Sequence, residues 1–234
     1  MQFEGSGAVD PVVDFDRTWS SRPDLVEVGE IYRLRRGPYL RWVKPSIDFS
    51  LATIALLVLV PVLAAVSAAI YLKMGRPVLI RQRRVGRYGN EFLLYKFRTM
   101  EPDRRLNSMP YPVENDRRQT HKSADDPRLT SLGRRLRASR LDELPQFLNV
   151  AKGDMSLVGP RPELSEIVIG YEPWQHRRHA VKPGVTGLWQ IAGETKLLKD
   201  CTEMELQYLG RISAVGDASI IVRTIPAMLR RNGI

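Results

Sequence analysis

The longest apolar segment of the chain runs from Phe49 to Leu72 and contains no charged residue. Its 24 residues exceed the length of about 20 that a transmembrane helix needs. Pro61 divides the segment into two halves of 12 residues, and proline removes one backbone hydrogen bond from a helix. Each half would be about 18 Å long, roughly half of a hydrocarbon core of about 30 Å. The apolar pattern therefore leaves a re-entrant helix, a spanning helix and a buried core helix open.

Basic residues flank this segment on both sides. Arg41 and Lys44 precede it, and Lys73 and Arg76 are the first basic residues that follow. The positive-inside rule is satisfied at both ends only if both lie on the cytoplasmic side, which favours a helix that enters the membrane and returns. Asp48 directly precedes the segment and is expected to cap the first free N–H groups of its helix.

The pattern after the apolar segment predicts a small β-hairpin. Val78–Gln82 and Glu91–Phe97 have the composition of two short strands, and the residues between them are rich in turn formers. Residues 101–125 are polar and contain three prolines, so we expect a loop or a lid there. Residues 1–40 are polar and mixed in charge, and we expect them to form an extension.

Helical patterns dominate the second half of the chain. Apolar residues at helical spacing predict a helix over Leu129–Ala138. A further helix is expected over Asp142–Lys152, with Pro145 in its first turn and Gly153 just beyond its end. These elements predict a mainly α fold with a small β-hairpin.

The remaining segments complete the predicted organisation. Val181–Gly193 is rich in glycine and loop-like, and Glu203–Leu229 is amphipathic and predicted to be helical in two pieces. We expect three parts: the extension of residues 1–40, a membrane helix over 41–75, and a compact domain over 76–234.

The charge balance restricts the class of partner. The chain has 36 Lys and Arg against 26 Asp and Glu, a formal net charge of +10. This excess predicts an anionic partner, which could be nucleic acid, acidic lipid or a phosphorylated substrate. The single cysteine, Cys201, excludes an intrachain disulfide framework and a four-cysteine zinc site.

Two adjacent carboxylates, Asp142 and Glu143, are the first candidates for chemistry. Neighbouring helix residues point about 100° apart, so the two side chains would serve different purposes. One could attack phosphorus, and the other could bind a divalent metal or manage a proton. Mg²⁺ would reduce the repulsion between a carboxylate and a diphosphate. The plain alternative is that both residues only stabilise the start of a helix.

Two arginines could bind phosphate near this pair. Arg161 stands in Gly-Pro-Arg-Pro, where glycine and two prolines restrict the backbone and direct one side chain. A guanidinium group matches phosphate in a bidentate geometry. Arg137 precedes Asp142 by about one and a half helical turns. Solvation at the surface is the alternative interpretation for both arginines.

Five ordered motifs carry a resemblance to a known family. They are Lys96-Phe-Arg98-Thr-Met100, Asp126-Pro-Arg-Leu-Thr130, Leu141-Asp-Glu-Leu-Pro-Gln146, Gly153-Asp-Met-Ser-Leu-Val-Gly-Pro-Arg-Pro162 and Pro183-Gly-Val-Thr-Gly-Leu-Trp-Gln190. Between about Lys44 and Leu229 the chain resembles the bacterial sugar transferases, the monotopic phosphoglycosyl transferases that start membrane glycan assembly.

The resemblance implies an activity and roles for individual residues. It implies transfer of a sugar 1-phosphate from a UDP-sugar to polyprenyl (undecaprenyl) phosphate with release of UMP, as a first membrane step of glycoconjugate or exopolysaccharide assembly. It implies that Asp142 is a nucleophile that becomes phosphoglycosylated, and that Glu143 is a ligand of Mg²⁺. It also implies that Arg137 and Arg161 bind the substrate phosphates.

The resemblance further implies how the protein meets the membrane. The family has a re-entrant helix that is broken at a proline, here Pro61, with its catalytic domain and interfacial amphipathic helices on the cytoplasmic face of the bacterial inner membrane. Lys96 and Arg98 would lie near the junction of membrane and domain or contact the lipid phosphate. One departure is Val60, since many relatives have serine before this proline.

Several alternatives remain beside this interpretation. The basic charge and the apolar segment alone would also suit a non-catalytic module that binds an anionic membrane surface. Nucleic-acid binding is disfavoured because aromatic residues are not interleaved with the arginines. Trp189 could stack on uracil or belong to the core, and His176 and His179 are not expected to form a metal site. The sugar and the oligomeric state stay open, with a homodimer as one alternative.

Overall fold

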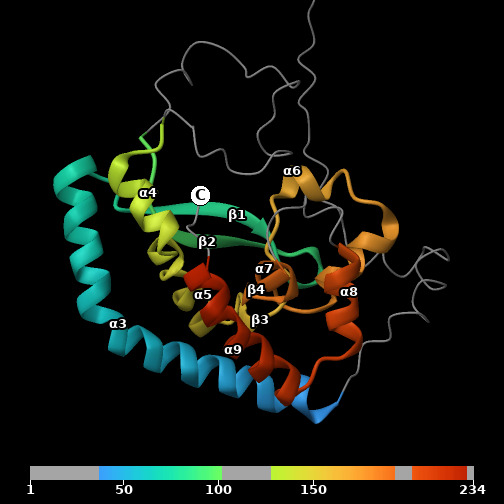
Figure 1. The fold of residues 1–234 in the computed structure, drawn as a ribbon. Helices are drawn as coiled ribbons and strands as arrows, with labels where there is room; N and C mark the ends of the chain where they lie inside the picture. Colours follow the sequence, from blue (N-terminus) through green and yellow to red (C-terminus); the bar gives the residue numbers. More distant parts are fainter. Residues whose placement is uncertain (1–36, 102–127, 193–201, 231–234) are drawn as a thin grey trace, which may run out of the picture.

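A computed structural model describes residues 37–101, 128–192 and 202–230 (Figure 1). Residues 102–125 of the expected loop, residues 1–36 of the expected extension, and Cys201 lie outside the described residues.

The apolar segment forms one long helix, α3, over Lys44–Met74, preceded by the π-helical turn η1 over Tyr39–Val43. By length and composition, this stretch could cross a membrane. Figure 1 shows that α3 is bent near its middle, so that its two arms follow two sides of the domain. Pro61 lies inside α3, and proline is the usual cause of a sharp helix kink. Pro61 thus bends α3, which continues as a helix on both sides of the proline.

Both arms of α3 pack against the rest of the protein. Ala52 on the first arm contacts a cluster that contains Leu94 and Met155. Val66 and Ile70 on the second arm belong to another cluster with Phe97 and Leu136. Only 11% of the most apolar window of this helix is buried. The interpretation as a buried core helix is therefore wrong, because most of the apolar surface of α3 faces outward.

The hairpin lies next to the second arm of α3. Strands β1, Leu79–Val85, and β2, Glu91–Phe97, pair antiparallel, with Leu79 opposite Phe97 and Val85 opposite Glu91. The prediction of a hairpin is confirmed, although β1 extends beyond the predicted Gln82. Arg98, directly after β2, donates to the carbonyl oxygens of Met74 and Gly75. It thereby satisfies backbone groups that the end of α3 leaves unpaired.

The segment after the hairpin differs from its prediction. Helix α4 spans Ser131–Ala138, the 3-10 turn η4 spans Leu141–Glu143, and helix α5 spans Gln146–Lys152 and ends at Gly153 with φ 84°. The predicted helix over Asp142–Lys152 is wrong at its beginning. Pro145 is the residue that precedes α5, so Asp142 and Glu143 lie on a separate turn.

A second sheet was not predicted. Strands β3, Ser156–Val158, and β4, Gly184–Thr186, pair in parallel, and they are connected through α6, Ser165–Val168, and the 3-10 helix η5, Pro173–Ala180. Helix α7 follows over Leu188–Ala192. The prediction of a loop over 181–193 is therefore wrong for β4 and α7. Glycine permits the close pairing, because a Cβ at Gly184 would lie 2.1 Å from the nitrogen of Gly159.

The C-terminal region forms two helices, as predicted: α8 over Thr202–Gly210 and α9 over Ala214–Arg230. Leu206 and Leu209 of α8 and Ile220 of α9 are buried with Val158 of β3 in one apolar cluster. The two helices therefore cover the β3–β4 sheet, and α9 lies beside the first arm of α3 (Figure 1).

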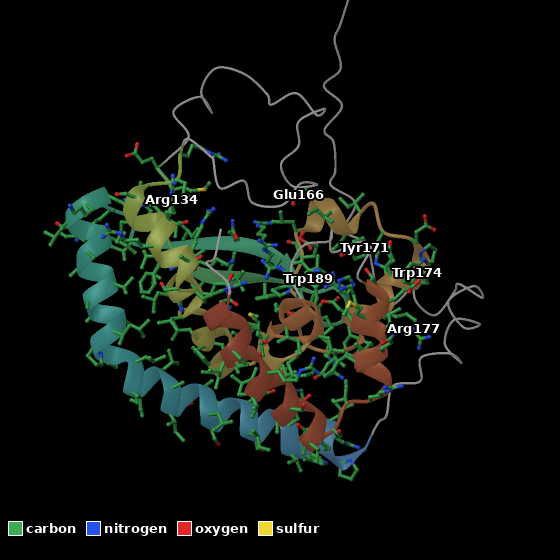
Figure 2. The ribbon with its side chains drawn as sticks, in the orientation of Figure 1. Arg134, Glu166, Tyr171, Trp174, Arg177 and Trp189 are labelled. Carbon is green, nitrogen blue, oxygen red and sulfur yellow. The ribbon has the colours of Figure 1, made fainter. Side chains whose placement is uncertain are left out.

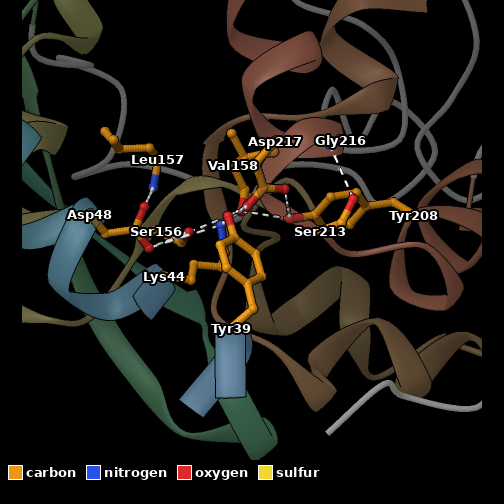
Figure 3. Close-up of polar contacts among 10 residues, drawn as sticks. All are labelled: Tyr39, Lys44, Asp48, Ser156, Leu157, Val158, Tyr208, Ser213, Gly216 and Asp217. Carbon is orange, nitrogen blue, oxygen red and sulfur yellow. Dashed lines mark hydrogen bonds and ion pairs between the residues drawn. The ribbon is translucent and has the colours of Figure 1, made fainter. Parts of the chain in front are cut away.

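A buried polar network joins the beginning of α3 to the domain (Figure 3). Lys44 Nζ lies 2.5 Å from Asp217 Oδ2, and the hydroxyls of Tyr39 and Tyr208 donate to the same carboxylate at 2.8 and 2.9 Å. Burial, followed by the hydrogen bond to Asp217, raises the pKa of Tyr39 above its usual value.

The expected role of Asp48 as a helix cap is wrong. Asp48 lies inside the first turns of α3 and accepts hydrogen bonds from Ser156 Oγ at 2.7 Å and from the Leu157 N–H at 3.1 Å. The carboxylate therefore fastens α3 to strand β3 instead of capping its own helix.

Candidate active site

The carboxylate pair lies on turn η4, between α4 and α5. Arg140 precedes the turn with φ 58°, in the left-handed region, which redirects the chain before Asp142. Asp142 is only 5% exposed. Glu143 Oε1 lies 3.2 Å from Lys96 Nζ, and its second oxygen lies 3.7 Å from Arg140 Nη1. The dyad is thus partly enclosed and faced by cations.

Lys96 and Arg98 have different surroundings, although Lys96 lies near the end of β2 and Arg98 directly follows this strand. Lys96 is buried and contacts Glu143, so it belongs to the site. Burial lowers the pKa of the Lys96 ammonium group, while the charge of Glu143 acts in the opposite direction. Arg98 instead contacts the end of α3, where this helix meets the rest of the domain.

A small cavity opens beside the dyad. Its polar lining comes from six side chains on separate elements: Arg84, Lys96, Glu143, Gln146, Arg161 and Gln190. Three of these residues are cationic and one is anionic. An anionic ligand such as a phosphate would be favoured in such a site.

Arg161 reaches this cavity from the turn that follows β3. Its guanidinium carbon lies 5.0 Å from the centre of the Trp189 ring, in a cation–π arrangement. Trp189 is only 5% exposed, and in the view of Figure 2 it lies between the hairpin and α8. The ring is therefore a core residue that supports Arg161, and the alternative of an open stacking surface for uracil is not supported.

Arg137 and Asp142 are not among the residues that line the cavity. Arg137 Nε donates to Thr99 Oγ1 at 3.0 Å, which connects α4 to the end of β2. The structure thus brings Glu143, Lys96 and Arg161 together, and it places Asp142 next to them on η4. Pro61 lies inside the apolar helix α3 and does not line the cavity.

Arg84 is a site residue that the sequence did not indicate. Its Nη1 donates to the Pro162 carbonyl at 3.3 Å and lies 3.4 Å from Glu163 Oε1. Burial lowers the pKa of Arg84 to about 10 although Glu163 raises it, so the guanidinium remains charged at neutral pH. In the sequence this residue is one of several basic residues after the apolar segment, and only the strand pairing turns it into the cavity.

The carboxylate pair could bind a hard divalent cation together with the oxygen atoms of a substrate phosphate. Mg²⁺ prefers oxygen ligands and is commonly bound by one or two carboxylates together with substrate phosphates. Among the described residues, no group of three or more His, Cys, Asp or Glu side chains could hold a metal ion. Glu143, which lines the cavity, could contribute one oxygen ligand to a Mg²⁺ site that phosphate oxygens complete.

The fold and the site together define a class: a domain fixed to a bent apolar helix, with a carboxylate pair beside a cationic cavity. The profile of the family described as bacterial sugar transferase matches residues 39–231. The chain belongs to this family.

Named relatives are similar over most of this chain. The galactosyl transferase CpsE of Streptococcus agalactiae is 41% identical over 69% of the chain and 36% of its own length. The UDP-glucose:undecaprenyl-phosphate glucose-1-phosphate transferase of Escherichia coli is 38% identical over 79% of the chain and 40% of its own length. The exopolysaccharide production protein ExoY of Rhizobium meliloti is 36% identical over 81% and 87%, respectively. The chain thus spans less than half of the two larger relatives and most of ExoY.

Proposed function

We propose that this protein transfers a sugar 1-phosphate from a UDP-sugar to polyprenyl phosphate, such as undecaprenyl phosphate, and releases UMP. The observation that carries the proposal is the pair of buried Asp142 and partly buried Glu143 beside a cavity with the cations of Arg84, Lys96 and Arg161. The printed names of relatives, which include an undecaprenyl-phosphate galactose phosphotransferase of Salmonella typhimurium, support this reaction.

The proposed mechanism has two displacements at one phosphorus. In the first, an oxygen of Asp142 bonds to the β-phosphorus of the UDP-sugar, and the bond to the bridging oxygen breaks. UMP leaves with that oxygen and its electron pair. In the second, a phosphate oxygen of the polyprenyl phosphate bonds to the same phosphorus, and the carboxylate of Asp142 leaves. The protein returns to its first state, as expected for covalent catalysis.

The other side chains would manage charge. Arg161 and Arg84 would bind phosphate oxygens, and Lys96 would orient Glu143 through their contact of 3.2 Å. Mg²⁺, bound by Glu143 and the diphosphate, would supply further neutralisation of the phosphate oxygens. Each of these groups lowers the repulsion that the anionic Asp142 meets when it approaches a diphosphate.

We also propose that α3 is re-entrant and that the domain lies on the cytoplasmic face of the membrane. Asp48 fastens the first arm to β3, and Arg98 binds the carbonyl groups at the end of the second arm. Because one domain holds both ends, both ends lie on one side of the bilayer. Leu57 and Val58, near the bend, are each 69% exposed, which suits insertion of the bend into lipid.

The test measures UMP release by the purified protein in detergent with Mg²⁺ and a panel of UDP-sugars. Without lipid acceptor we expect up to about one equivalent of UMP per site, because the covalent intermediate accumulates. With undecaprenyl phosphate we expect turnover. Asp142→Asn should abolish both, and chelation of Mg²⁺ should do the same reversibly.

The matched control is Arg134→Gln, which removes an exposed charge of α4 that lies away from Trp189 in Figure 2. This variant should release UMP like the unaltered protein. UMP that forms only when acceptor is present, or an Asp142→Asn variant that retains full turnover, would contradict the covalent mechanism. A protein that releases no UMP from any UDP-sugar would instead support the non-catalytic membrane-binding alternative.

A further inference from the structure

We propose that Arg178 and Glu205 are positioning residues that hold the main chain of Arg161 from both sides. The inference rests on the proposed function, since it concerns how the donor phosphate is bound. We refer to these two residues as the Arg178–Glu205 clamp.

The clamp forms hydrogen bonds with both main-chain polar groups of Arg161. Glu205 Oε1 accepts the N–H of Arg161 at 2.8 Å, and Arg178 Nη2 donates to the Arg161 carbonyl at 2.6 Å. The two side chains also pair with each other, with 2.6 Å between Arg178 Nη2 and Glu205 Oε2. Tyr171 accepts a further bond of 2.6 Å from Arg178 Nη1. The position of the Arg161 backbone is therefore fixed by charged donors and acceptors.

The pair is almost completely removed from water. The side chains of Arg178 and Glu205 are 1% and 2% exposed. Burial lowers the pKa of Arg178, but the charge of the facing Glu205 and the contact with Tyr171 raise it by more. The pKa of Arg178 therefore lies above its usual value, and the guanidinium stays charged.

Stability alone does not explain such a pair, because well-packed apolar residues in its place are often equally stable or better. What apolar residues could not supply is directed bonding to the N–H and the carbonyl of Arg161.

The clamp completes a set of constraints on one side chain. Pro160 and Pro162 restrict the backbone on both sides of Arg161, and Trp189 supports its guanidinium group. The clamp residues come from η5 and α8, 17 and 44 positions further along the chain. The packing of these two helices thus determines where Arg161 presents its charge.

The first experiment measures kcat and KM for UMP release with Glu205→Gln. The amide can still accept the N–H of Arg161, but it cannot neutralise Arg178, so the clamp should relax. A displacement of about 1 Å in a site can cost about 100-fold in rate. We therefore expect kcat/KM for the UDP-sugar to fall by about 10- to 100-fold. Tyr171→Phe, which removes one hydroxyl, should lower it in the same direction by less.

The second experiment separates positioning from general support. In a double-mutant cycle, Glu205→Gln is measured again in an Arg161→Ala background. If Glu205 acts through Arg161, the additional loss in kcat/KM disappears in that background. An equal loss in both backgrounds would overturn the proposal. If Glu205→Gln does not fold, Tyr171→Phe takes its place in the same cycle, and the same two outcomes apply.

Asp217→Asn is the matched control. It also removes the carboxylate of a buried ion pair, with Lys44 at 2.5 Å, but it does not contact Arg161. We expect a lower unfolding temperature with an unchanged kcat/KM for the UDP-sugar. A loss as large as that of Glu205→Gln would contradict a specific role for the clamp. Full activity of Glu205→Gln would contradict the role of the clamp and leave the proposed function intact. Absence of UMP release by the unaltered protein would instead contradict the proposed function.

Discussion

His179 illustrates how a single buried residue responds to its charged neighbours. It is 6% exposed, its ring stacks on Tyr171 with 6.2 Å between centroids, and it follows Arg178 directly. Burial, then the positive charge of Arg178 and the proximity of His176, lower the pKa of His179 well below its usual value. The folded protein therefore holds this imidazole neutral at neutral pH.

This environment predicts a loss of stability in mild acid. The unfolded chain binds the proton at a pH of about 6.5, whereas the folded protein resists it until much lower pH. The free energy of unfolding is therefore unaffected by His179 above about pH 6.5. Below that pH it decreases by up to about 1.4 kcal/mol per pH unit, because the unfolded chain binds a proton that the folded protein does not. The unfolding temperature, measured from about pH 7.5 to pH 5.5, should fall less steeply for His179→Gln. Equal slopes for both proteins would contradict the prediction.

At the scale of elements, helix α4 approaches the end of β2 closely because of one glycine. A Cβ at Gly133 would lie 1.8 Å from the carbonyl oxygen of Thr99, which is a backbone atom that cannot rotate away. The same contact brings Arg137 Nε within 3.0 Å of Thr99 Oγ1. The position of Arg137 therefore depends on the absence of a side chain one turn earlier.

We predict that Gly133→Ala destabilises the protein and reduces UMP release. Alanine improves helix propensity by about 1 kcal/mol, but overpacking costs about 1–3 kcal/mol and more when backbone must move. The steric cost should win, and thermal unfolding measures it. Gly210→Ala is the control, because a Cβ there would meet nothing within 4 Å. It should leave stability unchanged or raise it by up to about 1 kcal/mol, and a similar loss in both variants would contradict the account.

At the scale of the whole molecule, the bent helix α3 and the domain form one unit. The domain contacts the first arm through the Asp48 and Lys44 networks and the second arm through Val66 and Ile70. A straight spanning helix would separate its ends by the full bilayer, about 30 Å. The contacts place both arms of α3 against the domain, as the proposed re-entrant arrangement needs.

This arrangement predicts the labelling of single cysteines by a membrane-impermeant maleimide, in a Cys201→Ser background. Ser46→Cys and Lys73→Cys, both at exposed positions at opposite ends of α3, should react only in vesicles that expose the cytoplasmic face. Val58→Cys, near the bend, should react from neither side. Labelling of positions 46 and 73 from opposite faces would identify a spanning helix.

Much of the local structure could be predicted from residue patterns. The hairpin, the two C-terminal helices and the position of the apolar helix follow from periodicity and turn residues, which act over a few positions. The start of α5 was misplaced because Pro145 was assigned to the first turn of a helix that in fact begins after it. The β3–β4 sheet was missed, since strands of three residues carry too little alternation to be recognised.

The sequence by itself determined the chemistry that is available: a carboxylate dyad, an arginine in a restricted turn, and an apolar helix interrupted by proline. Tertiary structure alone decided which groups meet. It brought Arg84 and Lys96 to the dyad, turned Asp48 towards β3, and closed Arg178 and Glu205 around Arg161. The physical reason is that hydrogen bonds and ion pairs depend on distance in space, and these partners lie up to 109 positions apart along the chain.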